Sequence, residues 1–353
     1  MKNVRYLILF VFFLPSIQLF SQSTPVQKGA VERITVHGKS LEGNLEGDSP
    51  DRHVSIYLPA SYKSHPKRRY PVVYFLHGFT DNDAQWYGLQ KHWINLPRIL
   101  DSVFATGRVR EMIIVTPDAY TRYGGSMYSN SVTTGNWEAF VARELVSYID
   151  GHYRTLAQKD SRGLAGHSMG GYGTLRIGLK HPEVFSSLYL LSPCCLDQNG
   201  DPSRRRTDLD TVKTAEDFQK VRNFMTKAAF ASAAAWSPDP TNPPLYVQLP
   251  TKEEPWNRMV LNKWMANSPL VTLDQNITNI KQLQAFSFDA GDKDAGIAAS
   301  IRTLDKELDN YAIKHGFEIY EGDHLNRIAE RIAQKMLPLF GANLRFDAGA
   351  GKK

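Results

Sequence analysis

The chain has 353 residues and a mass of 39.8 kDa, with 42% hydrophobic, 22% charged and 11% aromatic residues. This length and composition exclude a mostly disordered chain and a small disulfide-stapled fold, and leave one large domain or two modest ones. The net charge of +6 is small and dispersed along the chain, so no nucleic-acid partner is expected.

The first residues indicate an export signal. Lys2 and Arg5 precede an almost entirely apolar run at 6–20, and small and polar residues follow at 21–24. This pattern is typical of a secretory signal peptide, and the run is shorter than the roughly 20 residues of a membrane span. We therefore expect a signal peptide over 1–22 and a periplasmic or secreted protein without stable membrane insertion after cleavage. An uncleaved anchor is the alternative.

After a linker at 23–30, β-like and helical segments alternate up to residue 345, and the tail at 346–353 is expected to fray. The predicted strands cover 31–36, 53–58, 71–76, 112–115, 163–165, 188–191, 285–288 and 317–320, and the first two could pair as a hairpin. The predicted helices cover 96–105, 137–149, 171–180, 298–313 and 325–337. This alternation predicts an α/β fold with a mostly parallel sheet covered by helices on both faces.

One stretch breaks this alternation. Between Pro193 and Leu283 lie a charged loop, an Ala-rich helical segment at 215–235 and Pro-rich turns with large aromatic residues. The stretch is too long for a simple crossover connection. Because sheet elements resume beyond it, we interpret residues of about 197–270 as an insertion above the sheet.

The sequence Gly166-His167-Ser168-Met169-Gly170 follows a predicted strand and opens a predicted helix. A sharp strand-to-helix turn would expose Ser168 at the carboxyl edge of the sheet, and only small residues two before and two after the serine permit that turn. The helix amino terminus would also direct free N–H groups toward a developing oxyanion. Ser168 is therefore the candidate nucleophile.

A nucleophilic serine needs a base and an orienting acid, which follow it along the chain in this arrangement. His324 lies after the last predicted strand, where a loop can carry it over the sheet edge. The acid should follow the preceding strand, and we prefer Asp294 with Asp292 as the alternative. His167, beside the nucleophile, should point away from the reacting face.

A buried strand ends at Leu76, and a loop begins with His77-Gly78-Phe79. Backbone N–H groups are free to face the site at such a position. We expect the N–H of Phe79, or alternatively that of Gly78, to complete an oxyanion hole together with the N–H of Met169.

Taken together, these motifs resemble the putative-esterase (esterase D-like) family of α/β-hydrolases, which includes feruloyl and acetylxylan esterases, S-formylglutathione hydrolases and mycolyltransferases. The resemblance covers about Val31 to Leu339 and is carried by the following motifs: Tyr57-Leu58-Pro59, the Tyr74 to Phe79 run, Tyr148-Ile149-Asp150, Tyr153-Arg154-Thr155, Gly166 to Gly173, Gly291-x-x-Asp294 and Gly322-x-His324. It implies an α/β-hydrolase fold, a triad at Ser168, Asp294 and His324, and oxyanion positions at Phe79 and Met169.

The resemblance also limits the activities to be considered. S-formylglutathione hydrolases are cytosolic, which disagrees with the export signal, and mycolyltransferases use Glu where this chain offers Asp294. The hypothesis is an exported serine ester hydrolase acting on feruloyl or acetyl esters of carbohydrates, as small molecules or on polysaccharides. The alternatives are an acyltransferase, a thioesterase of the S-formylglutathione type and a non-catalytic carbohydrate-binding relative. No metal or nucleotide motif is present, so no cofactor or metal is expected.

The candidate substrate contacts lie near the insertion and the oxyanion loop. A segment that leaves the carboxyl end of a parallel strand emerges on the side of Ser168, so the insertion is predicted to form a partial lid. Its aromatic residues Trp236, Tyr246 and Trp256 are candidate contacts, as are Gly78 and Tyr128 in the loops before it. The only cysteines, Cys194 and Cys195, are adjacent and exclude a disulfide framework. Two reduced buried thiols are favoured there over a strained vicinal disulfide.

Overall fold

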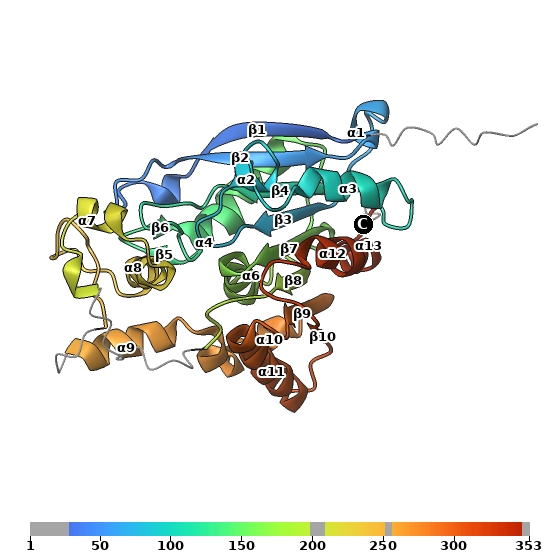
Figure 1. Cartoon of the computed structure of the whole chain (residues 1–353). Coiled ribbons are helices and arrows are strands. Elements are labelled where there is room, and N and C mark those ends of the chain that lie inside the picture. The colour runs from blue at the N-terminus through green and yellow to red at the C-terminus, as the bar shows by residue number, and fades with distance from the viewer. Residues whose placement is uncertain (1–27, 198–208, 251–255, 348–353) are drawn as a thin grey trace, which may run out of the picture.

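The structure is a computed structural model that describes residues 28–197, 209–250 and 256–347 (Figure 1). The predicted signal peptide, most of the linker and nearly all of the C-terminal tail lie outside the described residues, as does part of the insertion. No helix within these three ranges is long and apolar enough to cross a membrane.

One eight-stranded sheet forms the centre of the described residues, in the order β1-β2-β4-β3-β7-β8-β9-β10. The strands are β1 (Ala30–His37), β2 (Asp51–Leu58), β3 (Val72–Leu76), β4 (Ile113–Pro117), β7 (Arg162–His167), β8 (Ser187–Leu191), β9 (Ala285–Gly291) and β10 (Gly316–Tyr320). Six of these strands, β4, β3, β7, β8, β9 and β10, are parallel to one another. Strands β1 and β2 form an antiparallel hairpin, and β2 pairs antiparallel with β4. Each predicted strand is present within a few residues of its expected bounds, and the expected hairpin forms.

The helices cover both faces of this sheet. They are α1 (Ser61–Ser64), α2 (Asp83–Trp86), α3 (Leu96–Phe104), α4 (Trp137–Ala139), α5 (Val146–His152), α6 (Met169–Lys180), α7 (Ala215–Lys220), α8 (Phe224–Trp236), α9 (Trp256–Ala266), α10 (Ile277–Ile280), α11 (Ala295–Asn310), α12 (Ile328–Arg331) and α13 (Leu337–Asn343). A π-helical segment, Phe140–Leu145, joins α4 to α5, and a second one, Ile332–Met336, joins α12 to α13. A short two-stranded sheet, β5 (Asn130–Ser131) with β6 (Gly135–Asn136), was not expected from the sequence.

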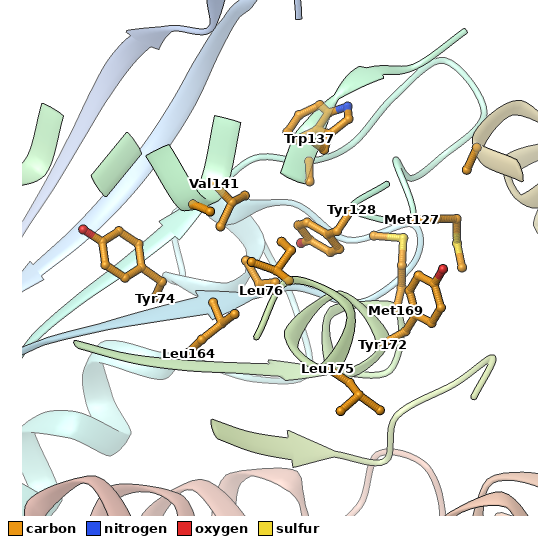
Figure 2. Close-up of a cluster of buried hydrophobic side chains, with 14 of the residues drawn as sticks. Tyr74, Leu76, Met127, Tyr128, Trp137, Val141, Leu164, Met169, Tyr172 and Leu175 are labelled. Atoms are coloured by element: carbon orange, nitrogen blue, oxygen red, sulfur yellow. The ribbon is translucent and has the colours of Figure 1, made fainter. Parts of the chain in front are cut away.

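The continuous apolar runs form strands that are buried on both faces. All five residues of β3 are buried, and so are all five of β4 and of β8. Because successive side chains of a strand point to opposite faces, Tyr74 and Leu76 pack in one core while Val73 and Phe75 pack in the other. Figure 2 shows the first of these cores, where Tyr74 and Leu76 lie with Leu164 among the side chains of the covering helices.

Three helical boundaries differ from the sequence expectation. The Ala-rich stretch divides into α7 and α8 because the side chain of Asn223 accepts a hydrogen bond from the N–H of Thr226 and begins a new helix. The helix expected at 298–313 forms earlier, over Ala295–Asn310. The helix expected at 325–337 begins only at Ile328, since the residues before it form the turn that carries His324.

The insertion packs on the loop between β4 and α4 (Figure 1). Tyr123 donates a hydrogen bond from its hydroxyl to the carbonyl of Leu245 (2.8 Å), and Ser131 donates to the carbonyl of Ala234 (2.5 Å). Helix α8 contacts both β5 and α9. The described part of the insertion therefore shares its core with the sheet domain.

Candidate active site

The turn at Ser168 has the geometry that its flanking glycines suggest. Ser168 lies between β7 and α6 with φ 56° and ψ −115°, outside the conformations that most residues adopt. A Cβ atom at Gly166 would lie 2.3 Å from the carbonyl oxygen of Gly170, and one at Gly170 would lie 1.9 Å from that of Leu76. Neither position has room for a side chain, so both glycines are required for the turn that projects Ser168 from the sheet.

The structure brings the three predicted catalytic side chains together from three separate loops. Nε2 of His324 accepts a hydrogen bond from Oγ of Ser168 (2.9 Å), and Nδ1 of the same ring donates to Oδ2 of Asp294 (2.5 Å). The His324 side chain is about one-third exposed, at 35%, and that of Asp294 less, at 18%. A neutral imidazole held in this tautomer can take the serine proton, and the carboxylate can stabilise the imidazolium that results.

Asp292, the alternative acid, has a different contact. Its Oδ1 accepts a hydrogen bond from the backbone N–H of Gly322 (2.9 Å), and its own N–H donates to the carbonyl of Tyr320 (2.8 Å). These bonds join the loop after β9 to the loop that carries His324. The geometry therefore favours Asp294 as the partner of the imidazole and gives Asp292 the task of positioning the loop.

His167 lies directly behind His324. Its ring centroid is 4.8 Å from that of His324, and its Nε2 donates a hydrogen bond to the backbone carbonyl of His324 (3.0 Å). Burial, with a smaller contribution from the nearby His324, lowers the pKa of His167 to about 3, so the ring is neutral. His167 does not line the cavity beside Ser168, and its contact with His324 could not be predicted from the sequence.

The loop after β3 lies beside Ser168. A Cβ atom at Gly78 would lie 3.6 Å from Cβ of Ser168, and one at Gly125 would meet the side chains of both Phe79 and Met169. Met169 is the first residue of α6, where a backbone N–H has no partner within the helix. In the part of the chain that the structure describes, neither the N–H of Phe79 nor that of Met169 donates a hydrogen bond, so both are available to an oxyanion.

Buried groups hold this loop in place. Nδ1 of His77 donates to the carbonyl of Gly78 (2.8 Å), and Nε2 accepts from the N–H of Ala119 (2.8 Å). The hydroxyl of Tyr128 donates to the carbonyl of His77 (3.1 Å). These contacts hold the backbone at His77 and Gly78 and so position the N–H of Phe79.

A cavity of about 510 Å³ opens on Ser168. Apolar side chains provide much of its wall: Phe79, Met127, Met169, Phe224, Met225, Ala228 and Ile297. Polar and sulfur-containing residues complete it: Ser168, Cys194, Cys195, Asp197, Ser232, Asp294, Ser300 and His324, with Gly296. Over the described ranges, no three His, Cys, Asp or Glu side chains are grouped so that they could hold a metal ion.

The structure corrects the expected substrate contacts. Tyr128 is fully buried and supports the loop after β3, and Trp236 is buried against Tyr172 and Trp264, so neither reaches the cavity. Tyr246 is half-buried outside the cavity wall.

The two remaining candidates, Gly78 and Trp256, are not found in the described wall of the cavity. Gly78 lies beside Ser168 but is not part of the cavity wall. Trp256 begins α9, and its side chain lies outside the described part of the structure.

The insertion reaches the cavity through the first turn of α8 instead. Phe224 and Met225 are 56% and 58% exposed, and both line the cavity. The ring of Phe224 stands edge-on to that of Phe79, with 5.4 Å between the centroids. Sequence reasoning missed this pair; the only available signal was two large apolar residues directly after the capping residue Asn223.

Comparison with known proteins agrees with this architecture. Residues 49–328 match the sequence profile of the family described as "Putative esterase". The chain belongs to this family. It is 33% identical over 170 residues to an endo-1,4-beta-xylanase/feruloyl esterase of Xylanibacter ruminicola, a match that covers 47% of this chain and 22% of that protein. It is 29% identical over 220 residues to an esterase of Mycobacterium tuberculosis, covering 54% of this chain and 44% of that protein.

The chain thus spans less than half the length of these curated relatives. Among solved structures, a ferulic acid esterase superposes with a TM-score of 0.63 at 21% identity, covering 90% of this chain and 99% of the other. At that level of identity the likeness establishes the α/β-hydrolase fold.

Proposed function

We propose that this family member is an exported serine carboxylic-ester hydrolase that works through an acyl-enzyme. The observation that carries the proposal is the continuous hydrogen-bonded chain from Ser168 through His324 to Asp294, at the edge of a cavity. Membership of the family supports the reaction class. Export is proposed from the charged and apolar pattern of residues 1–22.

In the first half-reaction, Oγ of Ser168 attacks the ester carbonyl carbon while Nε2 of His324 takes the hydroxyl proton. The oxyanion then accepts hydrogen bonds from the N–H groups of Phe79 and Met169, and each such donor is worth about 3 kcal/mol at the transition state. His324 passes its proton to the leaving alcohol, and the acyl group remains on Ser168.

In the second half-reaction, water attacks the acyl-enzyme and His324 again serves as base. The partly exposed His324 side chain gives solvent a route to the acyl carbon. Asp294 retains its negative charge throughout and holds Nδ1–H in the orientation that leaves Nε2 free to act.

The walls of the cavity favour a flat, apolar acyl group. Phe79 and Phe224 form an aromatic edge, and Met127, Met169 and Met225 offer polarisable sulfur beside it. Aromatic rings and methionine sulfur both bind planar aromatic groups well. A feruloyl ester of a carbohydrate therefore fits this site better than an acetyl ester does. The Xylanibacter ruminicola relative, an endo-1,4-beta-xylanase/feruloyl esterase, supports the same choice.

The experiment is a comparison of p-nitrophenyl ferulate with p-nitrophenyl acetate, two esters with the same leaving group, using the wild-type protein and Ser168→Ala. The proposal expects hydrolysis of both esters, a higher kcat/KM for the ferulate, and loss of both activities in the variant. A preference for acetate would refute the acyl assignment alone, whereas wild-type protein that hydrolyses neither ester would refute the reaction class.

A further inference from the structure

The two cysteines of the chain meet in the wall of the cavity. Cys194 and Cys195 both line it, and their Sγ atoms are 2.8 Å apart. The whole sequence contains no other cysteine, so the only intramolecular partner of either thiol is its neighbour. Neither sulfur takes part in the hydrolytic steps described above.

The backbone holds this pair in an uncommon conformation. Ser192 has φ 41° and Cys195 has φ 61°, values that cost free energy in residues with a side chain. Hydrogen bonds on both sides maintain it: the N–H of Ser192 donates to the carbonyl of Asp289 (2.8 Å), and that of Cys194 donates to the carbonyl of Ser168 (3.2 Å). The segment 192–195 is therefore fixed between strand β9 and the nucleophile turn, with both sulfurs directed into the same space.

We propose that Cys194 and Cys195 form a reversible dithiol–disulfide couple that opens on the substrate cavity, so that chemistry at the pair controls access to Ser168. A disulfide has its sulfurs about 2.05 Å apart, so closure requires each Sγ to move by only a fraction of an ångström. The chain is also proposed to be exported, and exported proteins meet conditions in which disulfides persist.

The oxidant is a small-molecule disulfide. One cysteine thiolate attacks a sulfur of the oxidant and releases one thiolate product; the second cysteine then attacks the protein sulfur of the mixed disulfide and releases the other. Two S–H bonds of the protein are replaced by one S–S bond, and the oxidant becomes two thiols. The neighbouring thiol and burial raise the pKa of Cys194.

Contact with the nucleophile connects the pair to the site. The carbonyl of Ser168 accepts a hydrogen bond from the N–H of Cys194. The Ser168 side chain also acts to lower the pKa of Cys194, but Cys195 and burial raise that pKa by more. A group that bridged both sulfurs would therefore occupy the cavity beside Ser168. Phenylarsine oxide forms such a bridge: its arsenic binds two thiols and releases its oxygen as water. Once the pair is a disulfide, that reaction cannot occur.

The first experiment counts thiols in the full-length protein after treatment with oxidised glutathione. The expected result is a fall from two titratable thiols to none, an intact mass lower by two hydrogen atoms, and a single chain on a non-reducing gel. Cys194→Ser, which has one thiol, should instead yield a glutathione adduct. Two unchanged thiols, a stable adduct on the wild-type protein, or chains cross-linked through cysteine would overturn the proposal.

The second experiment treats reduced and oxidised protein with phenylarsine oxide and measures ester hydrolysis; this part rests on the proposed function, whereas the thiol count does not. The reduced protein should lose activity by at least about tenfold because the arsenical fills the cavity beside Ser168. Dimercaptopropanol should restore the activity, and the oxidised protein should resist. Cys194→Ala and Cys195→Ser, each compared with its own untreated sample, should also resist. Reduced protein that carries the arsenic by mass yet hydrolyses ester at the untreated rate would refute the connection to the cavity.

Discussion

Replacing His167 with glutamine should make stability less sensitive to acid. The pKa of His167 in the folded protein is about 3, against an ordinary value of 6.5, chiefly because the ring is buried. Between these two values the unfolded chain binds a proton that the folded chain refuses, so stability falls as the pH falls. One pKa unit corresponds to about 1.4 kcal/mol. The native protein should therefore lose about 1.4 kcal/mol per pH unit through this residue, and about 5 kcal/mol over the whole range.

The assay is chemical denaturation at pH 7, 6, 5 and 4 for the wild-type protein and His167→Gln. Glutamine offers an N–H to the carbonyl of His324 but does not titrate, so the stability of the variant should decline less steeply, by about 1.4 kcal/mol per pH unit between pH 6 and 4. The difference between the two slopes isolates this residue from the carboxylates that titrate in both proteins. Equal slopes would show that His167 is not held neutral by burial.

His167→Phe is the matched variant for activity. It also removes the titrating group but deletes the hydrogen bond to the carbonyl of His324. Both variants should therefore share the shallow pH slope, while only His167→Phe should lose kcat, by about tenfold for one lost hydrogen bond. If His167→Gln and His167→Phe lost kcat equally, the contact with His324 would not be what positions the base.

Three further outcomes are expected. Asp294→Asn should lower kcat by about 10³- to 10⁴-fold, whereas Asp292→Asn, which keeps an oxygen acceptor for the Gly322 N–H, should stay within about tenfold of the wild type; steady-state kinetics that reversed this order would contradict the assignment. Gly170→Ala should destabilise the protein by about 3 kcal/mol or more because its Cβ would meet a backbone carbonyl at 1.9 Å, while Gly151→Ala, which meets nothing within 4 Å on helix α5, should be neutral or slightly stabilising in denaturant unfolding. Phe224→Ala should lower kcat/KM for p-nitrophenyl ferulate by about three- to tenfold and leave p-nitrophenyl acetate nearly unchanged; equal losses on both esters would argue against contact with the acyl group.

The sheet and the geometry at Ser168 could be anticipated because local patterns determine them. A run such as Val72 to Leu76 is apolar at every position, which suits a strand with a core on each face. At the turn that carries Ser168, positions 166 and 170 have no room for a side chain, so the turn requires glycine at both. These two positions and Ser168 lie within one stretch of five residues, which makes the pattern visible in the sequence.

The lining of the cavity could not be anticipated, because burial of a large aromatic residue depends on neighbours that are distant in sequence. Trp236 was expected to contact substrate, but Tyr172 and Trp264 enclose it. Phe224 was not singled out, yet it reaches the cavity because a capping residue divides the Ala-rich stretch and begins α8 there. Composition and spacing in the sequence do not show which of Trp236 and Phe224 is buried and which lines the cavity. Only the packing of the insertion decides this.

The most direct test of the account is the reaction of Ser168 with a fluorophosphonate. Such a reagent reacts with a serine activated by a neighbouring base. We predict one adduct per chain, located by peptide mass analysis on Ser168, with loss of ester hydrolysis in proportion to labelling. Ser168→Ala should take no adduct and should retain less than about a thousandth of the wild-type kcat. An adduct on another serine, or a Ser168→Ala protein that keeps more than about a hundredth of kcat, would contradict the assignment of Ser168 as the nucleophile.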